Sequence, residues 1–270
     1  MNEFLFPRTH LPGIKADILG SIGNWPISDT VTFMMFMTVI FILVTIWLRS
    51  FKEVPGFFQS FFELFIESVE NLLKSLTGGK NHRVKELIFP IVSIFLIIGS
   101  INIIGSLPII TEFTWSENGH LVPFFRKATA DINVTLPLAL VIVFSMQIFG
   151  VRNWGLVGYF KRFFPIDKWI QETKHGGVAG FFLGFIEMFI ALIELASEFI
   201  KVISLSLRLF GNMFAGEIVL SILMGAFAVF IPALWMGFEL MIAVIQALVF
   251  GCLTAVYYVM VIKEEGQSGH

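Results

Sequence analysis

Four charged residues recur every seven positions inside one long apolar segment of the sequence. They are Glu187, Glu194, Lys201 and Arg208. Seven residues make about two turns of an α-helix, so all four side chains would lie on one face. A charge near the centre of a bilayer costs at least about 2.5 kcal/mol, and such residues usually face a partner or a water-filled path. The spacing therefore predicts an ion-conducting surface, although Glu187 could only solvate the start of the helix.

Arg208 and Lys201 differ in their local partners. Lys201 has Glu198 three residues away, whereas Arg208 has no acid three or four residues away on its own helix. The plainer alternative, that both bases only pair with glutamates to specify helix packing, therefore explains Lys201 better than Arg208. Because a guanidinium stays protonated, Arg208 cannot relay protons and has to act as a fixed charge. We expect its partner on another helix or another chain.

Further polar residues extend this face on both sides of Arg208. Glu194 would lie about 21 Å away along a regular helix, on the cytoplasmic side in the orientation argued below. The small polar residues at intermediate three- or four-residue steps are Ser197, Ser204 and Asn212.

Two glutamates are expected at the opposite, outer side. Glu217 follows Arg208 by nine residues, and Glu239 stands seven residues before Gln246 in the last apolar segment. We expect Glu217 and Glu239 to share one outer vestibule. Acids then lie on both sides of the arginine, with no continuous acidic path past it.

The composition requires a membrane. Of 270 residues, 56% are hydrophobic and 14% are charged, so a soluble domain would expose far too much apolar surface. The net charge of −2 gives no indication of a nucleic-acid partner. We expect no metal site or other cofactor, because the single cysteine, Cys252, lies in an apolar run and the histidines lack ligand spacing. No phosphate-binding glycine loop is present, so this chain is not expected to bind a nucleotide.

Apolar runs of sufficient length predict the membrane spans. The last two runs are so long that each could be one tilted helix or two short ones, because forty helical residues extend about 60 Å. Residues 1–30 form an extracytoplasmic segment, residues 108–133 an exposed loop, and Pro137 predicts a local kink. The expected spans are 31–48, 87–107, 134–151, 178–216 and 218–262, with an interfacial amphipathic helix at 55–76.

Lys and Arg residues set the orientation. They gather after the first span and in the loop before residue 178, whereas the loop at 108–133 holds only Arg126 and Lys127. The positive-inside rule therefore predicts an N-terminus outside and a cytoplasmic C-terminus, for five spans or for seven.

The segment Ser204–Glu217, SLSLRLFGNMFAGE, resembles the signature of the a subunit of F-type ATP synthases. Matching segments follow in order across most of the chain: VPGFFQSFFELFIE from Val54, NIIGSLP ending at Pro108, TADINVTLPLAL from Thr129, and IQALVFGCLTAVYY from Ile245. The resemblance implies an all-α, multi-pass protein of the bacterial plasma (inner) membrane. It also implies that the last two helices are single and strongly tilted, giving five transmembrane helices plus the interfacial helix in one embedded domain, 31–270.

The resemblance also implies a function. The implied function is that of a stator subunit. Such a subunit conducts protons through two offset half-channels to and from the c-subunit ring, and so couples ion flow to rotation and ATP synthesis. ATP chemistry would occur on partner subunits, which include the b-subunit peripheral stalk, while lipid surrounds this chain. Carried onto matching positions, Arg208 is the essential charge, with Asn212 and Gln246 as its polar neighbours. Glu217 belongs to the outer half-channel, and Glu194 with Ser197 lies near the inner one.

One position departs from the family pattern, and two rival functions remain. Many proton-driven members pair a glutamate with a histidine where this chain has Glu217 and Glu239. A self-contained secondary transporter would predict two related halves, and the sequence shows no internal repeat. A purely structural respiratory subunit leaves the charge spacing unexplained. Asp131 and Asn133 either cap the helix that follows or belong to the outer vestibule.

Overall fold

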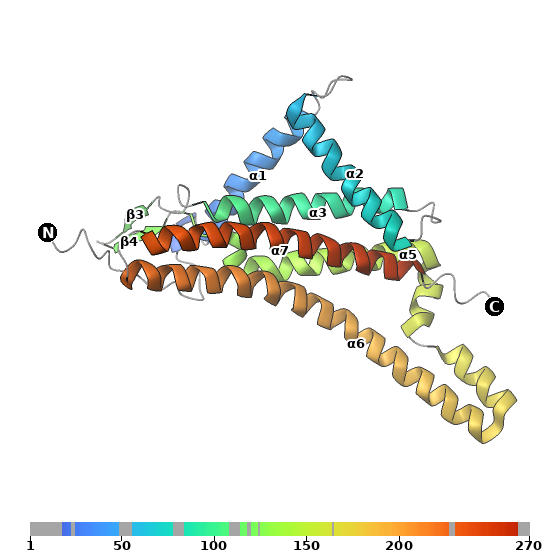
Figure 1. Ribbon diagram of the computed structural model, residues 1–270. Helices are drawn as coiled ribbons and strands as arrows, with labels where there is room; N and C mark the ends of the chain where they lie inside the picture. Colours follow the sequence, from blue (N-terminus) through green and yellow to red (C-terminus); the bar gives the residue numbers. More distant parts are fainter. Residues whose placement is uncertain are drawn as a thin grey trace. The chain divides into compact units, whose positions relative to one another are not determined.

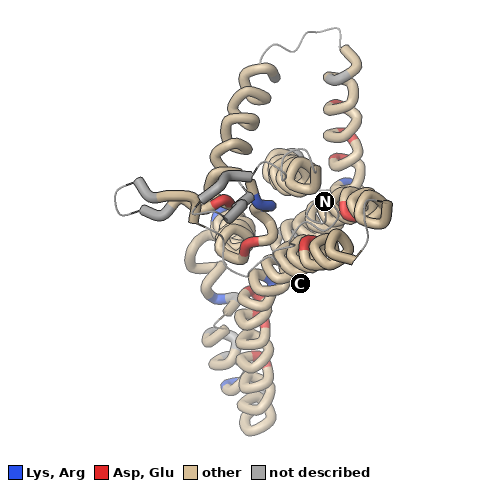
Figure 2. Tube along the Cα trace, turned by 90° about the vertical axis from the view of Figure 1, so that its left-hand side faces the viewer, with Lys and Arg blue, Asp and Glu red and all other residues tan. Residues whose placement is uncertain are grey.

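Five helices of this protein are long and apolar enough to cross a membrane, as the sequence predicts. In the computed structural model (Figure 1), residues 18–22, 25–48, 56–77, 84–107, 114–117, 120–123, 125–163, 165–226 and 230–263 are described. They fall into two compact units: Met1–Thr135 with Leu207–Ala255, and Leu136–Ser206 with Val256–His270. Figure 2 shows how sparsely charged residues are distributed along the helices.

In the first unit, helix α1 (Asp29–Leu48) is apolar around its whole circumference. Ser28 precedes it and accepts a hydrogen bond from the backbone N–H of Val31 at 3.3 Å, as an N-terminal cap does. Phe33 and Met37, one turn apart, form a buried cluster with Ile101 and Ala128. Most other large apolar side chains of α1 are exposed, which is the pattern of a lipid-facing helix.

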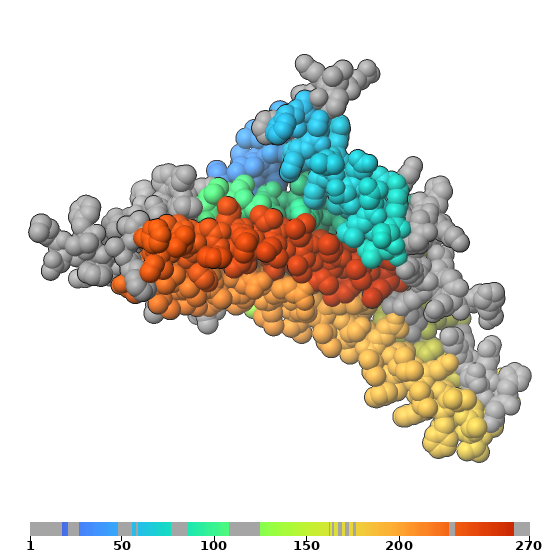
Figure 3. All heavy atoms as spheres, in the orientation of Figure 1, coloured from blue at the N-terminus to red at the C-terminus, as the bar shows by residue number. Residues whose placement is uncertain are grey.

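Helix α2 (Phe57–Thr77) is amphipathic, as predicted for residues 55–76. It buries Val69 and Leu73 and packs against α3 (Val84–Gly105), with the rings of Phe65 and Phe95 4.5 Å apart. Figure 3 shows its cyan side chains beside the green surface of α3. The polar face carries acids and bases that pair locally, such as Glu70 with Lys74 at 2.8 Å.

Small residues bring α3 close to α7 (Phe230–Lys263). A Cβ atom added at Gly99 would lie 3.4 Å from the Cβ of Ala247, in ordinary contact. One added at Gly251 would lie only 2.6 Å from the ring of Phe95. Glycine at these positions lets helices approach closely, as is common in membrane proteins.

The described segments also contain two short hairpins that the all-α prediction omits. Strand β1 (Ile18–Ile22) pairs antiparallel with β2 (Trp25–Ser28), and β3 (Thr114–Glu117) with β4 (His120–Pro123). A short 3-10 helix, η1 (Ala128–Ala130), follows. The prediction of an exposed loop at 108–133 is wrong for residues 126–131, which are buried. Ion pairs bury Arg126 and Lys127, and apolar packing with other helices buries Ala128 and Ala130. Local composition does not reveal these contacts with distant residues.

Most of helix α5 (Ile132–Phe163) lies in the second unit, and the helix breaks at Gly155, where φ is 71°. The left-handed φ explains why glycine stands there. Pro137 lies inside the helix near its start, and its kink stays a prediction. Just before the break, the indole N–H of Trp154 donates to the carbonyl oxygen of Val261 at 3.2 Å. Helix α6 (Ile166–Ala226) has a similar break at Gly177, where φ is 54°.

Beyond Gly177, α6 runs unbroken to Ala226, so the predicted boundary between the last two spans is wrong. The sequence ended one span at 216 and began the next at 218, whereas α7 begins at Phe230. The predicted spans left Glu217 between them, but this residue lies inside α6 and pairs with Arg126. Fifty residues from Gly177 to Ala226 extend about 75 Å, so α6 has to tilt strongly or leave the hydrocarbon layer.

Candidate functional site

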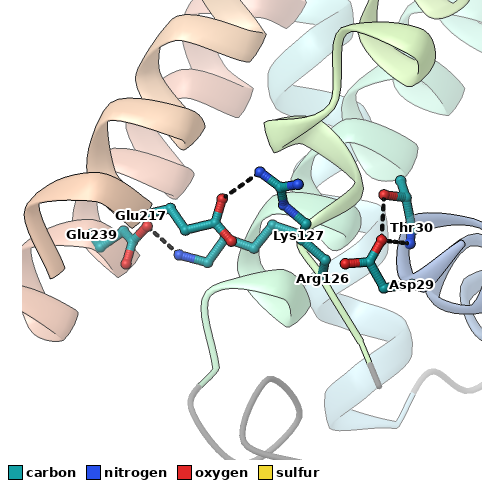
Figure 4. A network of polar contacts seen from close by, with 6 residues as sticks. All are labelled: Asp29, Thr30, Arg126, Lys127, Glu217 and Glu239. Atoms are coloured by element: carbon teal, nitrogen blue, oxygen red, sulfur yellow. Dashed lines mark hydrogen bonds and ion pairs between the residues drawn. The ribbon is translucent and has the colours of Figure 1, made fainter. Parts of the chain in front are cut away.

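Two consecutive basic residues reach two glutamates on different helices. The guanidinium of Arg126 lies 3.3 Å from Oε2 of Glu217 on α6, and Nζ of Lys127 contacts Oε1 of Glu239 on α7. Figure 4 shows the two pairs side by side. Arg126, Lys127 and Glu239 are 4%, 5% and 2% exposed, and Glu217 is half-buried. These four residues are called the charge cluster below.

Local backbone structure positions the two bases. They lie just before η1, where the carbonyl oxygen of Lys127 accepts a hydrogen bond from the N–H of Ala130 at 3.0 Å. The aliphatic stem of Lys127 crosses Gly105 of α3, where an added Cβ would lie 3.5 Å from the lysine Cγ. This stem therefore packs against a neighbouring helix while its ammonium points to Glu239.

A second glycine makes room for Glu239. A Cβ added at Gly216 would lie 2.7 Å from the Oε1 of Glu239. The carboxylate thus lies directly against the backbone of α6, one residue before Glu217. Glu217 also lies within electrostatic range of Lys127 and Glu239.

Charge balance explains how the cluster tolerates burial. An isolated buried charge costs several kcal/mol, whereas a charge that is paired and hydrogen-bonded avoids most of that cost. Each carboxylate here has a cation in contact. In the described part of the chain, Oε2 of Glu239 is nevertheless buried without a hydrogen-bond partner.

Two further acids near the cluster serve helix starts. Asp131 precedes α5, and its Oδ1 accepts hydrogen bonds from the backbone N–H and the side-chain amide of Asn133, at 2.8 and 3.0 Å. The capping interpretation of Asp131 is confirmed. Asp29, fully buried at the start of α1, accepts from the N–H of Thr30 at 2.7 Å (Figure 4).

The structure brings Asn212 and Gln246 together. The side-chain amide of Asn212 on α6 donates to Oε1 of Gln246 on α7 at 2.8 Å. Arg208 lies one turn before Asn212 on the same helix and is half-buried. Among the residues that the structure describes, Arg208 makes no ion pair or side-chain hydrogen bond.

The second unit holds a separate polar group. Nζ of Lys201 lies 2.7 Å from Glu198, as the three-residue spacing predicts, and 5.2 Å from the centre of the Tyr257 ring. The amide of Gln147 donates to the other oxygen of Glu198 at 2.8 Å. The packing interpretation of Lys201 is thereby confirmed.

The remaining predicted residues lie on α6 and are half-buried. The hydroxyl of Ser197 donates to the backbone carbonyl of Glu194 at 2.7 Å, so it is satisfied within its own helix. Ser204 and Glu187 are also half-buried. Glu194 belongs to the second unit, whereas the charge cluster belongs to the first.

Sequence reasoning missed Arg126 and Lys127 as partners of Glu217 and Glu239. It counted them only as charges of an exposed loop. A signal was present, because two adjacent bases stand one residue before the TADIN motif in a segment otherwise lacking Lys and Arg.

Comparisons with known proteins point to one family. The family model described as ATP synthase A chain matches residues 31–259. The chain is 34% identical to the sodium-ion-specific ATP synthase subunit a of Propionigenium modestum, over 89% of this chain and 76% of the relative. It is 33% identical to ATP synthase subunit a of Mycobacterium bovis, over 88% and 89%. For the Rhodopseudomonas palustris protein the identity is 32%, over 90% and 92%.

Proposed function

The chain belongs to the ATP synthase A chain family, and we propose that it is the stator subunit that carries protons to and from the rotating c ring. The family gives it a role in the membrane sector of ATP synthase and assembly with the other subunits. Its five apolar helices make it a membrane protein. The proton path, the contact with the ring and the b-subunit stalk, and the single embedded domain at 31–270 are parts of the proposal.

One observation carries the proposal, which is the lack of a counter-charge for Arg208. The buried bases Arg126 and Lys127 each contact a carboxylate of this chain, and so does the partly buried Lys201. Arg208 has no such contact among the described residues. A fixed charge on an apolar helix requires compensation. A carboxylate on the passing ring is the compensation that fits a rotary motor.

The proposed path has an outer and an inner part. A proton reaches the ring carboxylate past Glu217 and Glu239, and the neutralised site then turns through lipid. Near Glu194, Ser197 and Ser204 the proton leaves toward the cytoplasm. Arg208 favours the ionised ring carboxylate and blocks a direct leak between the two parts, with Asn212 and Gln246 as its polar neighbours. One charge crossing about 100 mV releases about 2.3 kcal/mol, which drives rotation.

The test replaces Arg208 with Ala or Lys in the whole synthase in membrane vesicles. ATP-driven proton uptake is expected to vanish in both variants, because neither keeps the planar, permanently charged guanidinium. Arg152→Ala, at an exposed position on α5, is the matched control and is expected to pump normally. Uptake at the control rate in Arg208→Ala, with the subunit assembled, would refute the proposal.

The coupling ion and the orientation need their own measurements. The Propionigenium modestum relative is named for sodium, so proton uptake is to be measured in sodium-free medium, where it should persist.

We propose a bacterial plasma membrane location with the N-terminus outside and the C-terminus cytoplasmic. A tag on the C-terminus should then be cut by protease in everted vesicles and protected in right-side-out ones.

A further inference from the structure

We propose that Lys127 is a tethered cation that keeps sodium and other metal ions out of the outer access path, so that only protons pass by Glu239. The inference rests on the proposed function of Glu217 and Glu239 in that path. Lys127 would be a specificity-determining residue, acting through the carboxylate that it contacts.

The contacts leave little room for a metal ion. A hard cation requires several oxygen ligands at once, and carboxylates are the strongest of them. In the charge cluster, Oε1 of Glu239 is held by the Lys127 ammonium, and Oε2 of Glu217 lies 3.3 Å from Arg126. A sodium ion that approached Glu239 would have to displace a cation already in contact, in a site that is nearly closed to water.

Lys127 is also unable to move far away. Its backbone carbonyl is fixed by the N–H of Ala130, and its aliphatic stem packs across Gly105. The residue is 5% exposed, so its ammonium is largely shielded from solvent. Removal from Glu239 would leave two opposite charges buried and uncompensated, which is strongly unfavourable.

A proton needs none of these rearrangements. Oε2 of Glu239 is buried and has no hydrogen-bond partner among the described residues. A hydronium ion can transfer its proton to Oε2, breaking its own O–H bond and leaving as water, while Oε1 stays in contact with Lys127. The charge of the cluster rises by one, and it falls again when that bond breaks and the proton moves on. The same carboxylate thus passes protons and remains closed to metal ions.

The experiment uses whole ATP synthase in liposomes and compares the wild type with Lys127→Gln and Lys127→Arg. ADP and phosphate are added outside, so that only complexes with the outer path facing the lumen synthesise ATP. The lumen is loaded with NaCl or with an equal concentration of choline chloride, and synthesis is driven by the same proton gradient. The readout is the ratio of the two rates.

The ratio is expected to be one for the wild type and for Lys127→Arg, which keeps a cation. In Lys127→Gln, lumenal sodium should slow ATP synthesis about tenfold relative to choline. This factor is equivalent to about 1.4 kcal/mol of sodium binding at the Glu239 carboxylate, which no longer has the lysine ammonium in contact. A ratio of one in Lys127→Gln would overturn the proposal, and so would synthesis by the wild type that depends on sodium.

The remaining outcome concerns whether the synthase assembles with the Lys127→Gln subunit. The glutamine amide can still donate a hydrogen bond to Glu239, so Lys127→Gln is expected to assemble, and its rate in choline is the reference for its rate in NaCl. If the variant fails to assemble, or assembles but synthesises no ATP in choline, Lys127 is a structural residue and the proposal is wrong. Failure of the proposed function would appear elsewhere, as proton uptake that survives in Arg208→Ala.

Discussion

Arg126 and Arg208 are two arginines of the same compact unit with opposite surroundings. Arg126 is 4% exposed and contacts Glu217, whereas Arg208 is half-buried and contacts no acid among the described residues. An arginine paired within its chain contributes to the fold, because its removal leaves a buried acid behind. An arginine without such a partner contributes little to the fold of the isolated chain. Its charge is available to another subunit.

The largest effect on the fold is expected from Arg126→Met. It leaves Glu217 without its cation, and breaking a buried pair costs about 3–5 kcal/mol. The loss of stability is measured by heating the purified synthase in detergent and recording the temperature at which this subunit is released. The double variant Arg126→Met with Glu217→Leu should recover most of the stability, since it removes both charges. Arg208→Ala should leave the transition nearly unchanged, and an equal loss in both arginine variants would contradict the comparison.

The space around the charge cluster gives the next prediction. Gly216→Ala adds a Cβ 2.7 Å from Oε1 of Glu239, so the carboxylate has to shift. Overpacking of this kind costs about 1–3 kcal/mol. The matched control is Gly211→Ala on the same helix, where no atom outside the local helix backbone lies within 4 Å of the added carbon. The control should keep or slightly raise thermal stability, because alanine favours helix; the reverse order of the two variants would show that the cluster is loosely packed.

The amide pair beside Arg208 should matter less to stability. Gln246→Ala removes the hydrogen bond that Asn212 donates at 2.8 Å, which is expected to cost about 1 kcal/mol. A double-mutant cycle with Asn212→Ala isolates the interaction, and the two losses should be clearly less than additive. Simple additivity in the thermal unfolding of the synthase would mean that the two amides act independently.

The sequence predicts those features of the fold that depend on the pattern of neighbouring residues. Long apolar runs located the five spans, and the period of polar residues identified α2 as amphipathic. The three-residue spacing predicted the contact between Glu198 and Lys201, because residues so spaced meet on one helix face. Each of these conclusions needs only neighbours within about two helical turns.

The features that the sequence did not predict depend on distant partners. Arg126 pairs with a residue 91 positions away, and Lys127 with one 112 positions away. Without knowledge of those contacts, the sequence predicts that both bases are charges of an exposed loop and that Glu217 lies between two spans. For the same reason, the last helix was predicted to begin at 218, whereas α7 begins at Phe230. The two hairpins were missed because each strand has only four or five residues.

The smallest effect is expected from Lys201→Met in the second unit. Lys201 is partly exposed, and a pair of this kind contributes about 0.2–1 kcal/mol. Glu198 would not lose all its partners, because Gln147 still donates to its other oxygen at 2.8 Å. The methionine sulfur can replace the ammonium over the Tyr257 ring. Thermal stability should therefore fall by less than a third of the Arg126→Met loss, and proton uptake should persist. A loss of proton uptake without a loss of stability would show that Lys201 belongs to the ion path and that Arg208 is not the only base acting there.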